Sequence, residues 1–149
     1  MSMPYRYLPN TLTRRDRAKQ KRGLLKSRRL YKKGVYYERP KVQSYKHRRS
    51  SHLRRAEEMY GVSKIAPSNE LARATRCTRK SLEKIVNKGR GAYYSSGSRP
   101  NQTAESWGLA RLASAITGQN AARVDYHILK NGCRKNSRAL RLAKKVISK

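Results

Sequence analysis

The first 55 residues carry 19 lysines and arginines but only two acids, Asp16 and Glu38. So much like charge repels itself in a compact body, and two carboxylates are too few to neutralise it. Residues 56–149 carry as many basic residues, but also six acids and far more apolar positions. We therefore expect a basic N-terminal arm with short helices, residues 1–61, that becomes fully ordered on a partner. A folded helical domain, residues 62–149, should follow it.

Helical periodicity marks the second part of the chain. Leu82, Ile85 and Val86 share one face of a helix that Thr78 starts and Gly89 follows. A short helix from Ser68 to Leu71 should precede it. Three more are expected, over 104–117 behind Thr103, over 121–130, and from Asn136 or Ser137 onward. The expected fold is mainly α, a small helical body of about four to five helices with an extended, irregular basic N-terminal arm.

Within the arm, Thr13 and Asp16 resemble a capping box at the start of a helix. Residues 14–22 are nearly all helix formers, and a second helical piece should run from Gly23 to about Lys33. Residues 34–49 combine tyrosine, valine and proline, which favours an extended segment or an edge strand. A short helix capped by Ser50 or Ser51 and closed by Gly61 completes the arm.

The stretch GRGAYYSSGSRPNQT, residues 89–103, concentrates glycine, serine and tyrosine and contains no acid. It lacks the G-x-x-x-x-G-K-[ST] order of a phosphate-binding P-loop, and a helix rather than a strand precedes it. We expect a structured connector between two helices. Tyr93 and Tyr94 would anchor it, and Arg90 and Arg99 are candidate grips for an anion or a carboxylate.

Groups for catalysis or metal binding are sparse in this sequence. The three histidines do not share a helical face with another ligand, Asp125 is expected to pair with an arginine, and Glu105 falls in the first turn of a helix. We therefore expect no enzyme, no cofactor, no metal site and no small-molecule substrate. Cys77 and Cys133 fit two separate thiols better than a disulfide. No run of 18 apolar residues is present, and the chain is expected to be intracellular.

A net charge of +30 points to an anionic partner such as the phosphate backbone of a nucleic acid. No module that reads base sequence is recognisable, so the contacts would be to backbone. The composition also holds ten tyrosines, one tryptophan and no phenylalanine, which suits contact surfaces better than a dry core. Tyr31, Tyr36, Tyr37 and Tyr45 could stack on unpaired bases. The candidate contacts to a polyanion or an acidic partner are Arg14, Arg15, Arg17, Lys19, Lys21, Arg22, Arg28, Arg29, Arg48, Arg49, Arg90 and Arg99. The candidate interface anchors are Tyr36, Tyr37, Tyr45, Tyr93 and Tyr94.

Two stretches, KGRGAYYSSGSRPNQT (88–103) and WGLARLASAITG (107–118), resemble a small basic uncharacterised domain of large icosahedral double-stranded DNA viruses of the chlorella-virus type. The resemblance covers about residues 75–133. It implies a virion protein, of the kind that lines the capsid beneath the major capsid protein and above an inner membrane. It assigns no functional residue.

The leading expectation is thus a non-enzymatic minor capsid (cement) protein on the inner face of a capsid, made in the host cytoplasm or nucleus. Its partners would be the major capsid protein and other minor capsid proteins, with viral DNA or an anionic inner membrane surface as further contacts. The alternative is a sequence-nonspecific DNA-binding or genome-packaging protein. A ribosomal protein is a weaker third reading.

Overall fold

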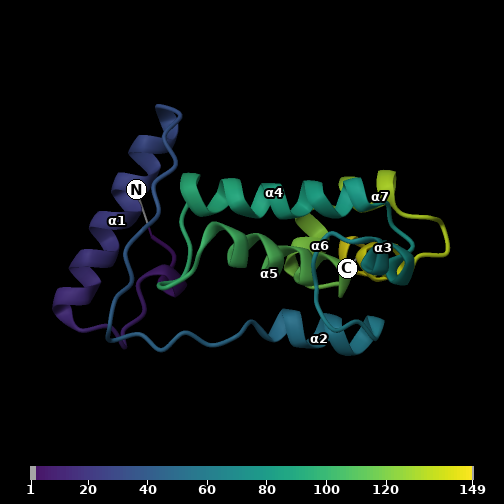
Figure 1. The fold of residues 1–149 in the computed structure, drawn as a ribbon, viewed down its shortest axis with the longest axis horizontal. Coiled ribbons are helices and arrows are strands. Elements are labelled where there is room, and N and C mark those ends of the chain that lie inside the picture. The colour runs from purple at the N-terminus through teal and green to yellow at the C-terminus, as the bar shows by residue number, and fades with distance from the viewer. Residues whose placement is uncertain (1–2, 149) are drawn as a thin grey trace. The chain divides into compact units, whose positions relative to one another are not determined.

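The computed structural model describes residues 3–148, and its regular structure is entirely helical (Figure 1). The mainly α fold class is therefore confirmed. The described residues form eight α-helices, more than the four to five expected. The elements are η1 (Tyr5–Tyr7), α1 (Arg14–Lys32), α2 (Ser51–Tyr60), α3 (Asn69–Thr75), α4 (Arg79–Ser95), α5 (Ala104–Ile116), α6 (Asn120–Val124), α7 (Tyr126–Gly132) and α8 (Arg138–Ile147).

The chain divides into two compact units. Unit 1 comprises residues 1–48 and 90–107, and unit 2 comprises residues 49–89 and 108–149. The helices α4 and α5 therefore each contribute residues to both units. This division differs from the expected boundary after residue 61, because the segment 90–107 belongs with the N-terminal residues.

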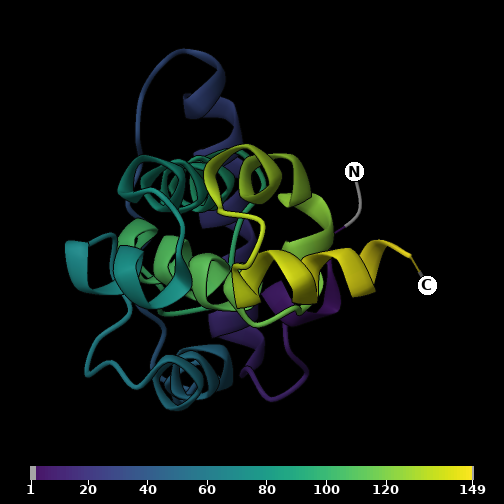
Figure 2. The ribbon, with the colours of Figure 1, turned by 90° about the vertical axis from the view of Figure 1, so that its right-hand side faces the viewer.

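Unit 2 is built on an apolar core. Buried side chains come from α2 through α8, among them Leu82 and Ile85 of α4 and Leu112 and Ile116 of α5, all of which have no exposed surface. The helices α6, α7 and α8 pack against one another (Figure 2). The helical spacing of Leu82, Ile85 and Val86 predicted a buried face, and all three are buried, so the periodicity identified this part of the core correctly.

Small residues set how closely the helices of unit 2 approach. A Cβ atom added to Gly89 would lie 2.5 Å from the Cα of Gly108, which places α4 directly against α5. A Cβ added to Gly132 at the end of α7 would lie 2.3 Å from the Cβ of Ser81. Nearby, Cys77 and Cys133 form a disulfide across 56 residues of sequence, contrary to the preferred reading as two thiols.

The helix α3 ends at Thr75, four residues after the expected end at Leu71, and two other helix boundaries also differ from the expected ones. The helix α4 runs six residues beyond Gly89 to Ser95, so half of the glycine-rich stretch is helical rather than a connector. Gly89 serves close packing inside the helix and not a helix end. The expected helix over 121–130 is broken at Asp125, because the side chain of Asp125 is turned inward to an arginine.

Unit 1 contains the basic N-terminal residues, and the structure gives them more order than the sequence suggested. The helix α1 runs without a break from Arg14 to Lys32, through Gly23. Thr13 caps it as predicted, since its hydroxyl accepts a hydrogen bond from the backbone N–H of Asp16 at 3.2 Å. Residues 35–50 are irregular, and the described chain has no strand there.

Candidate nucleic-acid interface

The helix α1 presents two chemically different faces. Gln20, Gly23, Leu24 and Ser27 are buried and recur at helical spacing along one side. The opposite side, with the residue that follows the helix, carries eight exposed basic residues: Arg14, Arg15, Lys21, Arg22, Lys26, Arg29, Lys32 and Lys33. We call these eight residues the cationic face. A helix of this length spans about 28 Å, so the charges form a long stripe.

Polar contacts hold the buried side of α1 in place. The side-chain amide of Gln20 donates to the carbonyls of Tyr7 at 3.3 Å and Ser98 at 3.4 Å. The hydroxyl of Ser27 donates to the carbonyl of Tyr94 at 2.9 Å. Leu24 completes this side by joining a small apolar cluster with Tyr7 and Leu8. Fixing one side of the helix in this way leaves the cationic face turned to solvent.

The single acid of α1 does not weaken the cationic face. Asp16 is the only acidic residue between Arg14 and Lys33. Its carboxylate accepts a hydrogen bond from the backbone N–H of Ser44 at 2.8 Å. Hydrogen bonds from Ser44 lower the pKa of Asp16, so the carboxylate stays ionised and bound to its own chain. The exposed charges of the helix are therefore all positive.

Arg39 connects α1 to other segments of unit 1 through side-chain hydrogen bonds. Its guanidinium donates to the hydroxyl of Ser27 at 3.0 Å, to the carbonyl of Tyr93 at 2.7 Å and to the hydroxyl of Ser98 at 2.7 Å. It also lies over the ring of Tyr93, 3.8 Å from the centroid. Burial lowers the pKa of Arg39 below its ordinary value, and the three oxygens that accept hydrogen bonds from its guanidinium are all neutral. Arg39 joins α1 to the 90–107 segment.

The remainder of the glycine-rich stretch fastens the irregular segment after α1. Asn101 has a positive φ of 63°, and its side-chain oxygen accepts the backbone N–H of Val42 at 2.8 Å. Its side-chain N–H groups donate to the carbonyls of Val42 at 3.0 Å and Tyr45 at 2.9 Å. The loop therefore acts as a structural clamp on the chain's own residues 42–45.

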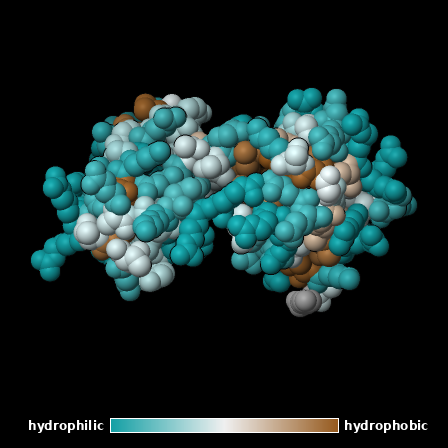
Figure 3. Space-filling model, turned by 60° about the horizontal axis from the view of Figure 1, so that its bottom comes forward, coloured by the Kyte–Doolittle hydropathy of each residue, from teal (hydrophilic) through white to brown (hydrophobic). Residues whose placement is uncertain are grey.

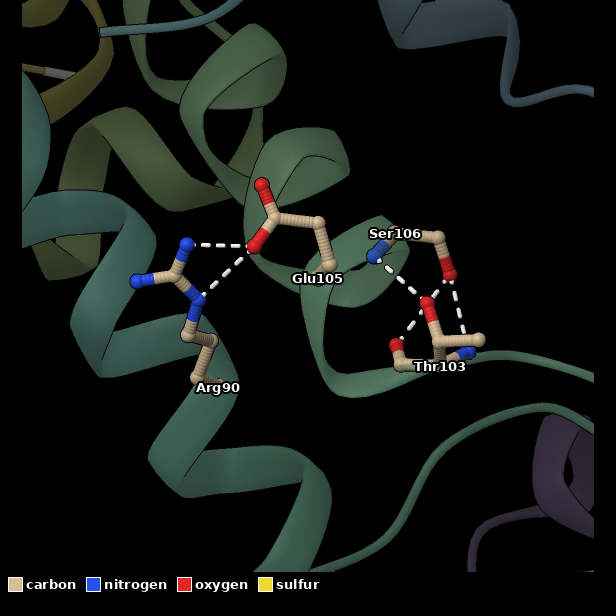
Figure 4. A network of polar contacts seen from close by, with 4 residues as sticks. All are labelled: Arg90, Thr103, Glu105 and Ser106. Carbon is tan, nitrogen blue, oxygen red and sulfur yellow. Dashed lines mark hydrogen bonds and ion pairs between the residues drawn. The ribbon is translucent and has the colours of Figure 1, made fainter. Parts of the chain in front are cut away.

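Arg90 also has an internal partner (Figure 4). Its guanidinium donates to the carboxylate of Glu105, with Nε at 3.0 Å from Oε2. Glu105 is held at the start of α5, where Thr103 and Ser106 exchange hydrogen bonds between backbone N–H groups and hydroxyls. The expected cap at Thr103 is thus confirmed. Arg90 is occupied within the protein and does not offer the anion grip that the sequence suggested.

The other candidate contact residues fall into three groups. Arg14, Arg15, Lys21, Arg22 and Arg29 lie on the cationic face, while Arg48 and Arg99 are exposed elsewhere in unit 1. A third group binds oxygens of its own chain: Arg17 on Leu8, Lys19 on Lys41, Arg28 on Ser96 and Arg49 on Glu57. The structure thus brings five of the twelve onto one surface. Lys26, Lys32 and Lys33 join them, and helical periodicity continued past Gly23 would have identified all three.

The candidate anchor tyrosines also separate by exposure. Tyr93 is 1% exposed and serves the interior, which removes it as a surface anchor. Tyr37, Tyr45 and Tyr94 are half-buried, and the ring of Tyr37 lies beneath the Lys26 ammonium at 4.6 Å. Tyr36 is 69% exposed. Only Tyr36 of the five is a freely accessible aromatic ring.

The described residues offer little to other kinds of chemistry. Among them, no three His, Cys, Asp or Glu side chains come together as metal ligands. No helix in residues 3–148 is long and apolar enough to cross a membrane. Over the face drawn in Figure 3 the surface is predominantly hydrophilic, and hydrophobic residues show only as separate patches. The long cationic face is the most distinctive surface feature of the described chain.

Comparison with known proteins places the chain in a family. No curated protein and no solved structure matches it. Residues 4–138 match the model of a family described as a family of unknown function, DUF5824, and this span includes all of unit 1 from Pro4 onward and most of unit 2. The chain therefore belongs to the DUF5824 family.

Proposed function

We propose that the protein binds nucleic acid without reading its sequence, through phosphate contacts along the cationic face of α1, and has no enzymatic role. The observation that carries the proposal is the arrangement of eight exposed basic residues on one helix side with no acid among them. Each phosphate that such a side chain neutralises releases condensed counterions, which favours binding and makes it dependent on salt.

The internal contacts of α1 support this proposal. Because Gln20 and Ser27 tie one side of the helix to the backbone of other segments, the charged side chains are presented on a fixed scaffold. Several neighbouring charges in a stripe also favour an extended polyanion over a small anion, since a small anion would engage only two or three of them. Duplex and single-stranded nucleic acids are polyanions of this kind.

The test compares two quadruple variants that lose the same charge. The first variant changes four residues of the cationic face to glutamine: Arg14, Arg15, Arg22 and Arg29. The second changes four exposed residues of unit 2 to glutamine: Arg73, Lys84, Arg134 and Lys135. We expect the first variant to bind DNA of several sequences more weakly by a similar factor in each. Its plot of log affinity against log salt should also flatten by about one for each lost contact.

The control distinguishes a defined surface from general attraction. The unit 2 variant should retain most of the affinity and most of the salt slope. If both variants lose equal affinity, the binding depends on net charge alone and the cationic face has no special part. If the unaltered protein binds neither duplex nor single-stranded DNA at low salt, the proposed function is wrong.

A second proposal is the one implied by the viral resemblance, that of a minor capsid protein on the inner face of a capsid. Under this proposal the partners are the major capsid protein, other minor capsid proteins, and viral DNA or an anionic inner membrane surface. The observation that favours it is the set of exposed aromatic residues in unit 1, Tyr5 at 68% and Tyr36 at 69%, because tyrosine is enriched at protein interfaces. The sequence predicted an extended N-terminal arm that could reach between capsid proteins. Because α1 packs within unit 1, the structure gives less support to such an arm.

Fractionation of virus particles separates the two proposals. Particles are opened, the DNA is released, and the protein is followed in the shell and DNA fractions over a series of salt concentrations. Elution with DNA as salt rises supports nucleic-acid binding. Retention on emptied shells through high salt supports the capsid role.

A further inference from the structure

Unit 1 also carries a group of tyrosine rings near the C-terminal end of α1, where Tyr31 lies in the last turn of the helix. The rings of Tyr31 and Tyr94 are nearly parallel, 7° apart, with centroids separated by 6.5 Å. The ring of Tyr36 lies 5.1 Å from that of Tyr94 and 6.0 Å from that of Tyr31. We call Tyr31, Tyr36 and Tyr94 the tyrosine platform.

The platform is supported from inside the unit. The buried Tyr93 meets Tyr94 edge to face, with centroids 5.0 Å apart and ring planes 88° apart. Arg39 in turn lies over Tyr93 and donates a backbone hydrogen bond to its hydroxyl at 3.1 Å. Exposure rises outward from this support, from 1% for Tyr93 to 37% for Tyr31 and 69% for Tyr36. The outer rings are thus accessible while the inner ones are fixed.

Burial and hydrophobic packing do not explain why the ring of Tyr36 lies where it does. A tyrosine with 69% of its surface exposed contributes little apolar burial to folding, yet it lies within stacking distance of two other rings. Burial, followed by the nearby Glu38 carboxylate, raises the pKa of Tyr94, so this ring is neutral near pH 7. A neutral aromatic surface of this form suits a flat aromatic ligand.

The charges beside the platform indicate what kind of aromatic ligand it suits. Lys32 and Lys33 directly follow Tyr31, and Lys26 belongs to the same helix and lies over Tyr37. Glu38 is the only acid between residues 17 and 56. An aromatic ligand that carries phosphates, such as an unpaired nucleobase, would find Lys32 and Lys33 at the same end of α1 as the ring of Tyr31. Bases within a duplex are already stacked and paired, so the platform has no access to their faces.

We propose that the tyrosine platform stacks an unpaired base of a single-stranded nucleic acid whose phosphates lie along the cationic face. This inference rests on the proposed function and narrows its ligand to single strands. Tyr36 provides the accessible ring, Tyr31 flanks it, and Tyr94 fixes both against the interior. Because every base has an aromatic face, the contact tolerates any sequence, in keeping with phosphate contacts that read none.

The test measures affinity for three probes of equal length at fixed salt: oligothymidylate, the same chain without its bases, and a duplex. We expect the unaltered protein to bind oligothymidylate at least about fivefold more tightly than the abasic chain, since stacking a base on an aromatic ring has an effect of this order. Tyr36→Ala should remove that preference and leave the affinity for the abasic chain unchanged. Tyr36→Trp should retain the preference.

Tyr5→Ala is the matched control, because Tyr5 is equally exposed in unit 1 but lies outside the platform. It should leave the preference intact. Equal binding of oligothymidylate and the abasic chain by the unaltered protein would overturn the stacking proposal and leave the phosphate contacts standing. A Tyr36→Ala variant that keeps the preference would also overturn it. Absence of binding to all three probes would instead refute the proposed function.

Discussion

The two units of this protein are folded by different means. In unit 2, 18 buried hydrophobic residues form a contiguous core. In unit 1, the corresponding cluster consists of Tyr7, Leu8 and Leu24, with Met3 and Trp107 partly buried beside it. Hydrogen bonds to distant segments, among them those from Gln20, Ser27, Arg39 and Asn101, add to this small cluster.

The contrast shows how so basic a segment can be ordered. Apolar burial stabilises unit 2 in proportion to the area removed from water. Unit 1 has little apolar surface to bury, so it uses arginine and amide groups as donors to backbone carbonyls. The bonds from arginine are charge-assisted and therefore stronger than the neutral bonds from the amides. Some of the basic residues of unit 1 thus form hydrogen bonds that stabilise its fold, and the others are exposed to solvent.

The largest expected effect concerns one ion pair from each unit. In unit 2, Arg111 donates two hydrogen bonds of 2.8 Å to Asp125, whose carboxylate has no exposed surface. Arg111→Met leaves this carboxylate buried without its cation, so we expect a loss of about 3–5 kcal/mol in the free energy of unfolding. Chemical denaturation followed by circular dichroism measures it.

The pair in unit 1 is the control. Arg90 and Glu105 have side chains that are 43% and 56% exposed, so Arg90→Met should cost less than about 1 kcal/mol. Adding Asp125→Asn to Arg111→Met should recover part of the loss, since no charge is then left unpaired. If Arg111→Met and Arg90→Met lower the free energy of unfolding equally, the burial of the ion pair does not decide how much each unit depends on it.

The next prediction concerns the polar brace of unit 1. Arg39→Met removes three side-chain hydrogen bonds and the contact over the Tyr93 ring, and we expect a loss of about 1.5–3 kcal/mol. The fluorescence of Trp107, the only tryptophan, reports on unit 1 during denaturation because its ring lies edge-on to Tyr7.

Arg29→Met is the comparison for that variant, since Arg29 is exposed on the cationic face and should cost less than about 0.5 kcal/mol. A similarly small change for Arg39→Met would mean that unit 1 does not depend on its polar contacts.

The smallest expected changes in the free energy of unfolding come from replacing two glycines of α4 by alanine. One glycine lies in each unit, and the two changes have opposite signs. Gly89→Ala forces a Cβ against the backbone of Gly108, so we expect a loss of about 1–3 kcal/mol. Gly91→Ala meets only the Tyr31 hydroxyl, at 3.7 Å, and should gain about 0.5–1 kcal/mol because alanine favours a helix interior. Thermal unfolding of both variants tests this, and a gain from Gly89→Ala would contradict the close approach of α4 and α5.

Local sequence signals predicted most helix starts and the apolar core. The caps at Thr13, Ser50, Ser68, Thr78, Thr103 and Ser137 are all observed, because a cap depends on residues two or three apart. The end of α4 was missed, because glycine inside a helix and glycine after a helix look alike until the packing partner is known. Gly108, which explains Gly89, is 19 positions away in the sequence.

The candidate site was predictable in part. Its arginines were identified from charge alone, but charge does not show which of them are occupied. Arg17, Lys19, Arg28, Arg49 and Arg90 bind partners within the protein. The local sequence gave no indication that Arg39 and Asn101 hold unit 1 together. Their hydrogen bonds to Tyr93, Ser98 and Val42 join residues that are 54 to 59 positions apart. The stacking of Tyr36 on Tyr94 was hidden for the same reason.

The sequence by itself determined the helical class, the apolar face of each main helix and the large positive charge, because these follow from residue type and short spacing. Only the tertiary structure decided that the basic N-terminal residues pack with the 90–107 segment, that eight charges share one exposed face and that three tyrosines meet. The reason is physical. Each of these outcomes depends on contacts between residues far apart in the chain, whose formation rests on the fit of whole segments and not on any local pattern.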